Sequence, residues 1–549
     1  MKTSIATVSI SGTFPEKLEA IAAAGFDGIE IFETDFLTFG ATPRELGKMI
    51  SDSGLEITLF QPFRDFEGLP EPLRSRAFER ARRKFEVMNE LGTDLMLICS
   101  NVSPEALGGV DRAAADLREL GELAASMGIR VGYEALAWGR HVNDHRDAWE
   151  IVRRADHPNV GLILDSFHTL VKRIDPGTIR SIPADRIFIV QLADAPRIDM
   201  DLLYLSRHFR SMPGEGDLPV VDFVRAVAAT GYTGALSLEV FNDQFRGGSP
   251  KVIAADGHRS LLYLMDQVRR SEPSLLGQSV PAMPARSPVA GIAFVEFAAA
   301  PDDVAPLTDV LRQLGFAPTA RHRSKEVTLY RQGDIRLVVN TEPQGLVHSQ
   351  YVTHGLSAYA FGIEVPDARS AVARAVALGA NVFEQGVAEG ETMVPAIRGV
   401  GGGLIYFLDR SEALGAIWDR EFVPLGNAAD ETGGLIRIDH LAQTMDYDQM
   451  LTWVLFYRSI FEVEKSPMVD VLDPAGLVRS QVVASASGSL RLTLNGADSS
   501  RTFAGEFVQR HFGSGVQHLA LATDDILGAA IALERRGFAP LEIPGTYYQ

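Results

Sequence analysis

The stretch Arg130-Val-Gly-Tyr-Glu134 is short, rich in β-forming residues and ends in a carboxylate. A segment with helical periodicity separates it from Val160-Gly-Leu-Ile-Leu-Asp165, which repeats the pattern. Because a closed barrel pairs every strand edge, eight such units in a row predict an α/β fold, a (β/α)8 TIM barrel over residues 1–270. The eight strand candidates are Ser4–Ile10, Gly28–Phe32, Ile57–Gln61, Leu95–Cys99, Arg130–Glu134, Val160–Asp165, Ile187–Leu192 and Ala235–Val240.

The composition is that of a globular protein, and its negative charge favours a small-molecule substrate over nucleic acid or lipid. The 549 residues are 46% hydrophobic and 22% charged, and this length exceeds one ordinary hydrophobic core. A formal net charge of −19 argues against nucleic acid or an anionic membrane as a partner. No apolar stretch reaches the roughly 18 residues of a membrane span, and no signal-peptide pattern opens the chain. We therefore expect a cytoplasmic protein, and a homo-oligomer is compatible with these features.

A second domain follows a linker. Residues 271–289 are rich in proline and small residues, which indicates an extended linker. Residues 290–549 are duplicated, and the simplest interpretation is an α+β domain with two βαβββ-type modules in each half. The matching segments are Gly291–Phe297 with Arg437–Gln443, and Tyr359–Asp367 with Gln517–Asp525.

Oxygen donors end four successive strands of the predicted barrel. They are Glu134, Asp165, Gln191 and Glu239, and the carboxyl ends of barrel strands converge on one mouth. Three carboxylates together would repel one another and raise each other's pKa, so a bound cation is expected. Oxygen ligands favour Mg²⁺ or Mn²⁺ without excluding Co²⁺ or Zn²⁺. The alternative is that each carboxylate pairs separately with an arginine or lysine at the barrel rim.

Four motifs lie at or between these strand ends: three begin at Glu134, Asp165 and Gln191, and the fourth lies between Gln191 and Glu239. They are Glu134-Ala-Leu-Ala-Trp-Gly-Arg-His141, Asp165-Ser-Phe-His168, Gln191-Leu-Ala-Asp194, and Ser206-Arg-His-Phe-Arg210 leading into Pro213-Gly-Glu-Gly-Asp217. They resemble the sugar-phosphate-isomerase-like barrels related to xylose isomerase, and among these most closely the bacterial 3-dehydroshikimate dehydratases. The likeness spans the first domain, and two-domain members of that family have a similar fusion. The resemblance implies dehydration of 3-dehydroshikimate to protocatechuate, on the route by which bacteria consume quinate and shikimate.

That chemistry needs an electrophile, a base and a carboxylate binder. The cation supplies the electrophile, and His168, expected in a loop above the metal, is the candidate base because a neutral imidazole suits proton abstraction near pH 7. Arg64 and Arg210 are candidates for the substrate carboxylate, since a guanidinium binds that group through two hydrogen bonds. His141 could lie near the substrate hydroxyls or the metal ligands. Each of these residues could instead be structural, the arginines as ion pairs at the rim.

The second domain contains Arg437-Ile-Asp-His440 and Gly515-Val-Gln-His518. These segments look like vicinal-oxygen-chelate modules and resemble 4-hydroxyphenylpyruvate dioxygenase. The resemblance implies a metal held by two histidines and a late glutamate, with His440 and His518 at the matching positions. The first half has Phe294 and Ala360 there, so it holds no metal in this way. The third ligand would fall beyond Gln549, so we expect an incomplete last module, and a regulatory or assembly role is as plausible as dioxygenase activity.

Three alternatives remain at this point. The barrel could serve a sugar or keto-acid isomerase or epimerase, with Glu134 and Glu239 recruited for a two-base proton transfer. The chain could act mainly as an iron-dependent dioxygenase through its second domain. It could also be a catalytically silent binding module that retains affinity without turnover. A zinc-dependent nuclease for abasic DNA is set aside, because that class needs more histidines at the strand ends and a basic face.

Overall fold

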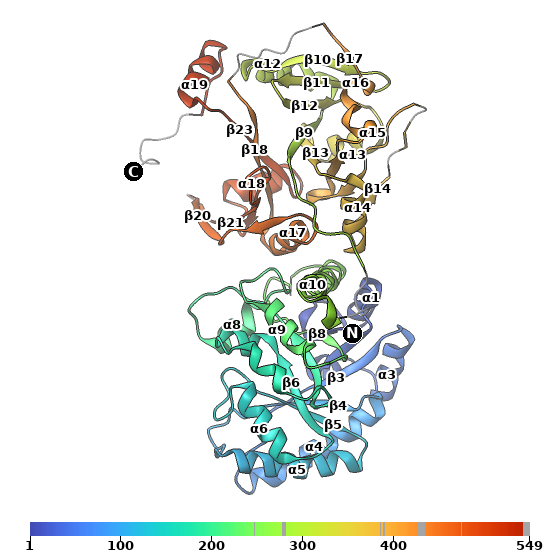
Figure 1. Ribbon diagram of the computed structural model, residues 1–549, viewed down its shortest axis with the longest axis vertical. Coiled ribbons are helices and arrows are strands. Elements are labelled where there is room, and N and C mark those ends of the chain that lie inside the picture. Colours follow the sequence, from blue (N-terminus) through green and yellow to red (C-terminus); the bar gives the residue numbers. More distant parts are fainter. Residues whose placement is uncertain are drawn as a thin grey trace. The chain divides into compact units, whose positions relative to one another are not determined.

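Eight parallel strands close into a barrel in the first unit of the computed structural model, Met1–Ala282 (Figure 1). The order of the strands follows the sequence and β8 pairs with β1, so the predicted (β/α)8 fold is confirmed. The strands are β1 (Thr3–Ala6), β2 (Gly28–Phe32), β3 (Glu56–Phe63), β4 (Leu95–Cys99), β5 (Arg130–Glu134), β6 (Val160–Asp165), β7 (Ile187–Leu192) and β8 (Leu236–Leu238). The structure describes residues 1–245, 247–276, 282–384, 386–387, 390–426, 434–473 and 475–541.

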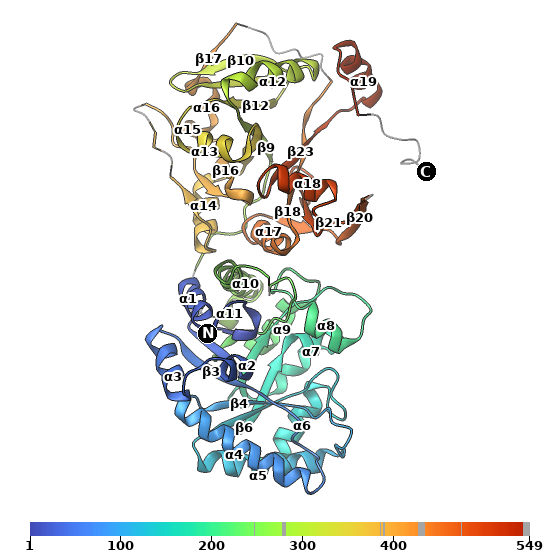
Figure 2. The ribbon, with the colours of Figure 1, turned by 180° about the vertical axis from the view of Figure 1, so that it is seen from behind.

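Helices surround the barrel strands, and Figure 2 shows α4 and α5 side by side on the outside of the barrel. The first helix illustrates how the sequence sets these boundaries: a capping box of Thr13 and Glu16 begins it, and Gly25, with φ of 92°, ends it. The helices are α1 (Phe14–Ala24), α2 (Glu33–Thr38), α3 (Pro43–Asp52), α4 (Leu73–Leu91), α5 (Val110–Ser126), α6 (His145–Ala155), α7 (Ser166–Val171), α8 (Leu202–His208), α9 (Val220–Ala228), α10 (Pro250–Ser271) and α11 (Pro273–Leu276).

Two predicted strands are too long. The first ends at Ala6 and passes into a 3-10 helix at Thr7–Ser9, and the eighth spans only Leu236–Leu238. The hydroxyl of Ser9 explains both differences, because it accepts a hydrogen bond from the Val240 amide (2.8 Å) where a strand backbone would otherwise pair. The side chain therefore replaces the sheet ladder at this end of the barrel.

The predicted linker is partly helical, since α11 occupies Pro273–Leu276. Residues 277–281 lie outside the described residues. Farther on, Ser287 forms a bridge with Phe461, so this end of the predicted linker belongs to the second unit, Met283–Gln549.

The second unit contains two mixed sheets whose central pairings repeat. In the first sheet β9 pairs antiparallel with β13 and parallel with β12, and in the second β18 pairs antiparallel with β23 and parallel with β22. This repetition bears out the predicted duplication. The first sheet contains β9 (Gly291–Ala298), β10 (Ala317–His322), β11 (Val327–Gln332), β12 (Ile335–Asn340), β13 (Ser357–Glu364), β14 (Val382–Phe383), β15 (Ala396–Arg398), β16 (Leu404–Leu408) and β17 (Phe422–Pro424). The second contains β18 (Arg437–Asp446), β19 (Val463–Lys465), β20 (Val469–Asp473), β21 (Gly476–Ser485), β22 (Arg491–Ala497) and β23 (Gly515–Ala522).

The helices of this unit connect the strands into modules. The run β9, α12, β10, β11 and β12 is one βαβββ module, and β13, α14, β14, β15 and β16 is another. The helices are α12 (Pro301–Gln313), α13 (Gly345–His354), α14 (Ala368–Ala377), α15 (Glu412–Gly415), α16 (Ile417–Glu421), α17 (Tyr447–Ile460), α18 (Phe503–Arg510) and α19 (Ile526–Arg535). Across the described ranges, no helix is both long enough and apolar enough to cross a lipid bilayer.

Candidate metal centre

The four predicted oxygen donors are all buried at the carboxyl ends of neighbouring barrel strands. Glu134 ends β5, Asp165 ends β6, Gln191 is the last residue but one of β7, and Glu239 directly follows β8. The exposed fraction of each residue is 6% or less. The barrel therefore brings side chains that are distant in sequence into one dry environment.

Asp165 and Glu239 share one guanidinium. Arg210 Nη1 lies 2.8 Å from Asp165 Oδ2 and 3.0 Å from Glu239 Oε2, and Arg210 is 1% exposed. Its Nη2 and Nε also donate to Ser206 Oγ. Arg210, a predicted binder of the substrate carboxylate, therefore contacts two buried carboxylates of the protein itself. Its role toward the substrate stays a prediction. The predicted alternative, an arginine or lysine for each carboxylate at the rim, differs from this arrangement in that one buried arginine contacts both Asp165 and Glu239.

Burial dominates the electrostatics of the carboxylates. It raises the pKa of Glu134 well above its usual range, and the neighbouring charges of Glu239 and Asp165 raise it further. Burial also raises the pKa of Asp165 and of Glu239, although the positive charge of Arg210 opposes the rise in both. One guanidinium therefore compensates the three carboxylates only in part.

The residues fit a divalent cation. Glu134 Oε1 and Gln191 Oε1 are buried without a hydrogen-bond partner, which is costly for polar atoms inside a protein. A cation among them would satisfy both oxygens and reduce the repulsion between the carboxylates. Glu134, Asp165 and His168 also each offer one ligand atom, all within 4.8 Å of one another.

His168 lies in the short helix α7 rather than in the predicted loop, because Asp165 Oδ1 accepts from the Phe167 amide and caps that helix. Its Nε2 is 3.6 Å from Asp165 Oδ2 and 3.7 Å from Glu134 Oε1. Burial lowers the pKa of His168 well below its usual value, and Arg210 lowers it further, so the ring is neutral near pH 7.

Both ring nitrogens of His168 face a donor. The Ala137 amide lies 3.2 Å from Nδ1, and Arg210 Nη2 lies 3.3 Å from Nε2. A neutral imidazole has one lone pair for hydrogen bonding, so it accepts at only one of these nitrogens. The ring can act as a base at Nε2 only in the tautomer that carries its proton on Nδ1. In that tautomer Nδ1 cannot accept the hydrogen bond from the Ala137 amide.

The other two predicted site residues are His141 and Arg64, and they have different neighbours. His141 Nε2 lies 2.9 Å from the Ala106 carbonyl oxygen, a contact that holds the loop after β5.

Arg64 follows β3, and its positive charge acts on Arg207. Burial and the charge of Arg64 lower the pKa of Arg207, whose guanidinium lies 4.8 Å above the Phe241 ring. Arg207 belongs to the motif Ser206–Arg210 and stands three residues before Arg210, but the sequence alone predicts no role for it.

Glu30 and Gln61 are a further pair that the sequence reasoning missed. Glu30 Oε2 accepts from Gln61 Nε2 (2.7 Å) and from Gln191 Nε2 (2.8 Å). The amide nitrogen of Gln191 is thereby held by Glu30, which leaves its oxygen as the free acceptor. Burial and the charge of Glu239 raise the pKa of Glu30 to about 8. The available signal was an acid between two isoleucines in Gly28-Ile-Glu-Ile-Phe32.

The second unit brings His440 and His518 together, as the repeat predicts. They lie on the paired strands β18 and β23, with their Nε2 atoms 3.2 Å apart. Within the described ranges, no third histidine, cysteine, aspartate or glutamate completes a metal-binding group with them. Phe294 and Ala360 occupy the corresponding strands, β9 and β13, of the first half.

The comparisons with known proteins assign each unit. A family described as "Xylose isomerase-like TIM barrel" matches residues 18–264, and "Hydroxyphenylpyruvate dioxygenase, HPPD, N-terminal" matches residues 286–423. The 3-dehydroshikimate dehydratases of Pseudomonas putida and Pseudomonas aeruginosa are each 48% identical over all of this chain and 87% of their own length. The chain belongs to the 3-dehydroshikimate dehydratase family.

Other relatives support the two-unit organisation of this dehydratase family member. A solved structure titled "xylose isomerase-like TIM barrel/4-hydroxyphenylpyruvate dioxygenase fusion protein" is 46% identical, with a TM-score of 0.91 over 100% of this chain and 88% of that chain. The 4-hydroxyphenylpyruvate dioxygenase of Pseudomonas aeruginosa is 35% identical over 47% of this chain and 73% of its own length. The resemblances stated from the motifs are thus confirmed for both units.

Proposed function

We propose that this enzyme is a hydro-lyase that converts 3-dehydroshikimate to protocatechuate at the mouth of its barrel. The observation that carries the proposal is the buried cluster of Glu134, Asp165 and Glu239, with an unpartnered oxygen on Glu134, in a chain that belongs to the dehydratase family. Quinate and shikimate catabolism, the cytoplasmic compartment and a homo-oligomer stay predictions from the sequence.

Glu134, Asp165, Gln191 and Glu239 would hold the cation, for which Mg²⁺, Mn²⁺ and Co²⁺ are the candidates. When bound, it supplies positive charge that polarises the substrate ketone and makes the adjacent C–H more acidic. Arg210 keeps Asp165 and Glu239 close together, and Glu30 turns the Gln191 oxygen away from itself. These two residues position the ligands.

His168 is the proposed general base. Its lowered pKa keeps the ring unprotonated at neutral pH, so Nε2 can take the proton from carbon once the lone pair lies there. The same nitrogen can then return that proton to the departing hydroxyl, which leaves as water. The grouping with Glu134 and Asp165 favours a second role, in which His168 is itself a metal ligand.

Arg64 and Arg207 are the proposed binders of the substrate carboxylate. Arg207 is a partly buried cation next to a second cation, a combination that an anionic ligand stabilises. No hydrogen bond or ion pair to a carboxylate is found for Arg207 among the described residues. Arg210, which was predicted for this task, is engaged by Asp165 and Glu239 instead.

The test is a dehydration assay with metal-free protein. We would add Mg²⁺, Mn²⁺ or Co²⁺ in turn to enzyme and 3-dehydroshikimate, and follow protocatechuate by its ultraviolet absorbance. The proposal expects product only with a cation present. No product with any cation would contradict it and favour an isomerase or epimerase of a related keto acid. Turnover that requires iron and consumes oxygen would point to a dioxygenase in the second unit.

A further inference from the structure

A cavity of about 410 Å³ lies in the first half of the second unit, away from the histidine pair on β18 and β23. Its lining comes from one face of the first sheet, on β9, β12 and β16, and from α16 and β17. This volume is in the range of sites that bind small molecules. The cavity is therefore large enough for one aromatic ring with its substituents.

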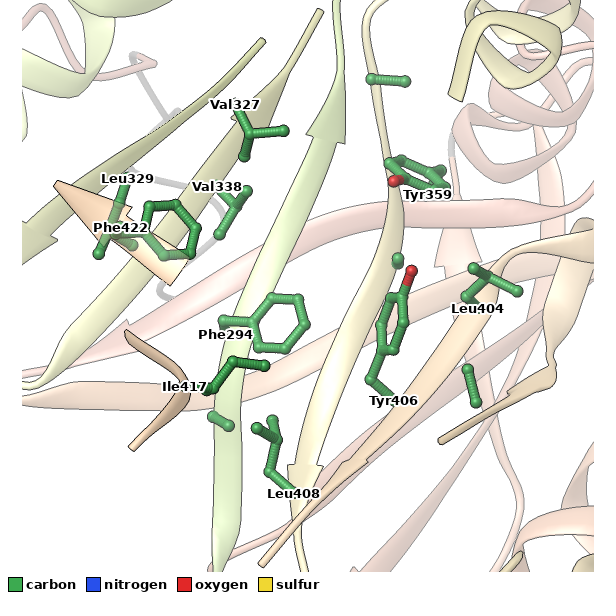
Figure 3. Packing of buried hydrophobic residues seen from close by; sticks show 14 of the residues in the cluster. Phe294, Val327, Leu329, Val338, Tyr359, Leu404, Tyr406, Leu408, Ile417 and Phe422 are labelled. Atoms are coloured by element: carbon green, nitrogen blue, oxygen red, sulfur yellow. The ribbon is translucent and has the colours of Figure 1, made fainter. Parts of the chain in front are cut away.

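Aromatic side chains form a continuous wall of this cavity. Phe294 lies 5.7 Å from Tyr406 and 5.4 Å from Trp418, and Trp418 lies 5.5 Å from Phe422, measured between ring centroids. Figure 3 shows the rings of Phe294 and Tyr406 side by side, with the Tyr406 hydroxyl pointing toward Tyr359. Flat faces and ring edges of this kind favour a planar aromatic ligand over a flexible aliphatic one.

Polar groups suited to hydroxyl recognition lie among these rings. Glu296 is buried on β9 and lines the cavity, and its Oε1 accepts from Asn340 Nδ2 at 2.7 Å. The Tyr406 side chain projects from β16 into the same lining. Burial raises the pKa of Glu296, and burial together with the charge of Glu296 raises the pKa of Tyr406. A carboxyl group and a phenol can both donate to or accept from a ligand hydroxyl.

The charges of the lining disfavour an anionic ligand. Lys325 Nζ is 2.9 Å from Glu391 Oε2, so this cation is already neutralised. His322 Nε2 lies 3.7 Å from Glu421 Oε2, and burial lowers the pKa of His322, which keeps it uncharged near neutral pH. The described lining contains more carboxyl groups than cations; these acids are Glu296, Glu342, Glu384, Glu391 and Glu421.

We propose that this cavity binds a small uncharged aromatic compound with hydroxyl groups, of the phenol or catechol class. The ring stacks against Phe294 and Trp418, and a hydroxyl bonds to Glu296 and Tyr406. The site is distinct from the barrel mouth in its chemistry, because the barrel substrate and product are both carboxylates.

The experiment uses the full chain and catechol as the probe, with binding measured by calorimetry and by saturation-transfer NMR. Tyr406→Phe removes one hydroxyl and should weaken catechol binding by about fivefold. Val338→Phe fills the cavity and should abolish binding, provided that its thermal unfolding stays cooperative. The barrel variant Glu134→Gln should bind catechol as the unchanged protein does.

Three results would overturn the proposal. The first is equal affinity for catechol in the unchanged protein, Tyr406→Phe and Val338→Phe. The second is tighter binding of benzoate than of catechol by the Glu134→Gln protein, which would mean that the cavity selects anions. The third is no binding of phenol or catechol at all. Tyr406→Phe is the conservative variant, so it decides the outcome if Val338→Phe fails to fold.

Discussion

The barrel mouth and the His440–His518 pair both place candidate metal ligands on neighbouring strands, but the two sites differ in how many candidate ligands they bring together. The barrel brings donors from four strands into a site where Glu134, Asp165, Gln191 and Glu239 are all buried. In the second unit two histidines meet across β18 and β23, and His518 is exposed. A closed barrel makes its strand ends converge, whereas two adjacent strands of an open sheet supply only a pair.

The two sites also differ in how deeply their charged groups are buried and in how far those charges are compensated. At the barrel mouth burial raises the pKa of three carboxyl groups, and Arg210 compensates them in part. In the second unit, His440 Nδ1 lies 3.0 Å from Asp439 Oδ2 at a partly exposed position. Buried clusters of incompletely compensated charges, as at the barrel mouth, are the ones expected to have a function.

The largest effect is expected for Glu134→Gln. The substitution keeps the size of the side chain and removes one carboxylate, so the rate of protocatechuate formation should fall by about 10³-fold because the cation is held less well. Steady-state rates measure it at a fixed metal concentration that is just sufficient to saturate the unchanged enzyme. The matched control is Glu119→Gln on an exposed face of α5, which should leave the rate unchanged. Near-full activity of Glu134→Gln would exclude the barrel mouth as the centre of catalysis.

His168→Ala should lower kcat by about 10²- to 10⁴-fold, the usual range for a lost general base. If His168 is the base, the affinity for Mn²⁺ should change little, because the oxygen donors remain. Calorimetric titration of metal-free protein, run beside the rate assay, separates the roles. A parallel loss of Mn²⁺ affinity would assign His168 as a ligand instead.

Metal affinity should rise with pH. The carboxyl groups of the metal-free site have raised pKa values, so protons compete with the cation, and affinity should increase by about tenfold per pH unit for each proton displaced. The pKa of Glu30 is raised to about 8 in the folded protein, from 4.5 in a free side chain. Because the folded state then holds a proton that the unfolded state has lost, the free energy of unfolding should decrease as the pH rises from about 4.5 through 8.

The thermal midpoint of the metal-free protein should therefore fall over that pH window. Saturating Mn²⁺ should restore most of the loss, because the cation neutralises the carboxylates that remain charged. Fluorescence-monitored melting with and without Mn²⁺ measures both curves. A metal affinity that does not vary between pH 5 and 8 would contradict the assignment of buried carboxylates as ligands.

Glu30→Leu should weaken metal binding by about 10- to 100-fold, since Gln191 and Gln61 lose the acceptor that orients their amides. Glu30→Gln keeps an oxygen acceptor and should recover much of the affinity. Titration with Mn²⁺ compares the two variants. Equal affinities would mean that Glu30 fills space in the barrel and does not position Gln191.

The smallest effect is expected for His440→Ala combined with His518→Ala. The proposed function places dehydration at the oxygen donors of the barrel, so kcat should stay within about twofold of the unchanged enzyme. Binding of Co²⁺ or Ni²⁺ to the second unit should be the property that disappears. A large fall in kcat would show that the two sites are coupled.

The sequence by itself determined the barrel and its ring of oxygen donors. Each strand is short and apolar, and each donor stands at its carboxyl end, as at Glu134 and Asp165, so topology alone predicts that they meet. The duplication in the second unit can also be recognised from short segments of sequence. The matching strands align His440 with Phe294 and His518 with Ala360.

Only the tertiary structure decided which charges compensate one another. Arg210 pairs with Asp165, 45 residues away in sequence, and Glu30 bonds to Gln191, 161 residues away. No local pattern contains such distances, because they depend on how the strands close and which side chains share the dry interior. Propensity and periodicity describe neighbours along the chain, whereas electrostatic partners are chosen by distance in space.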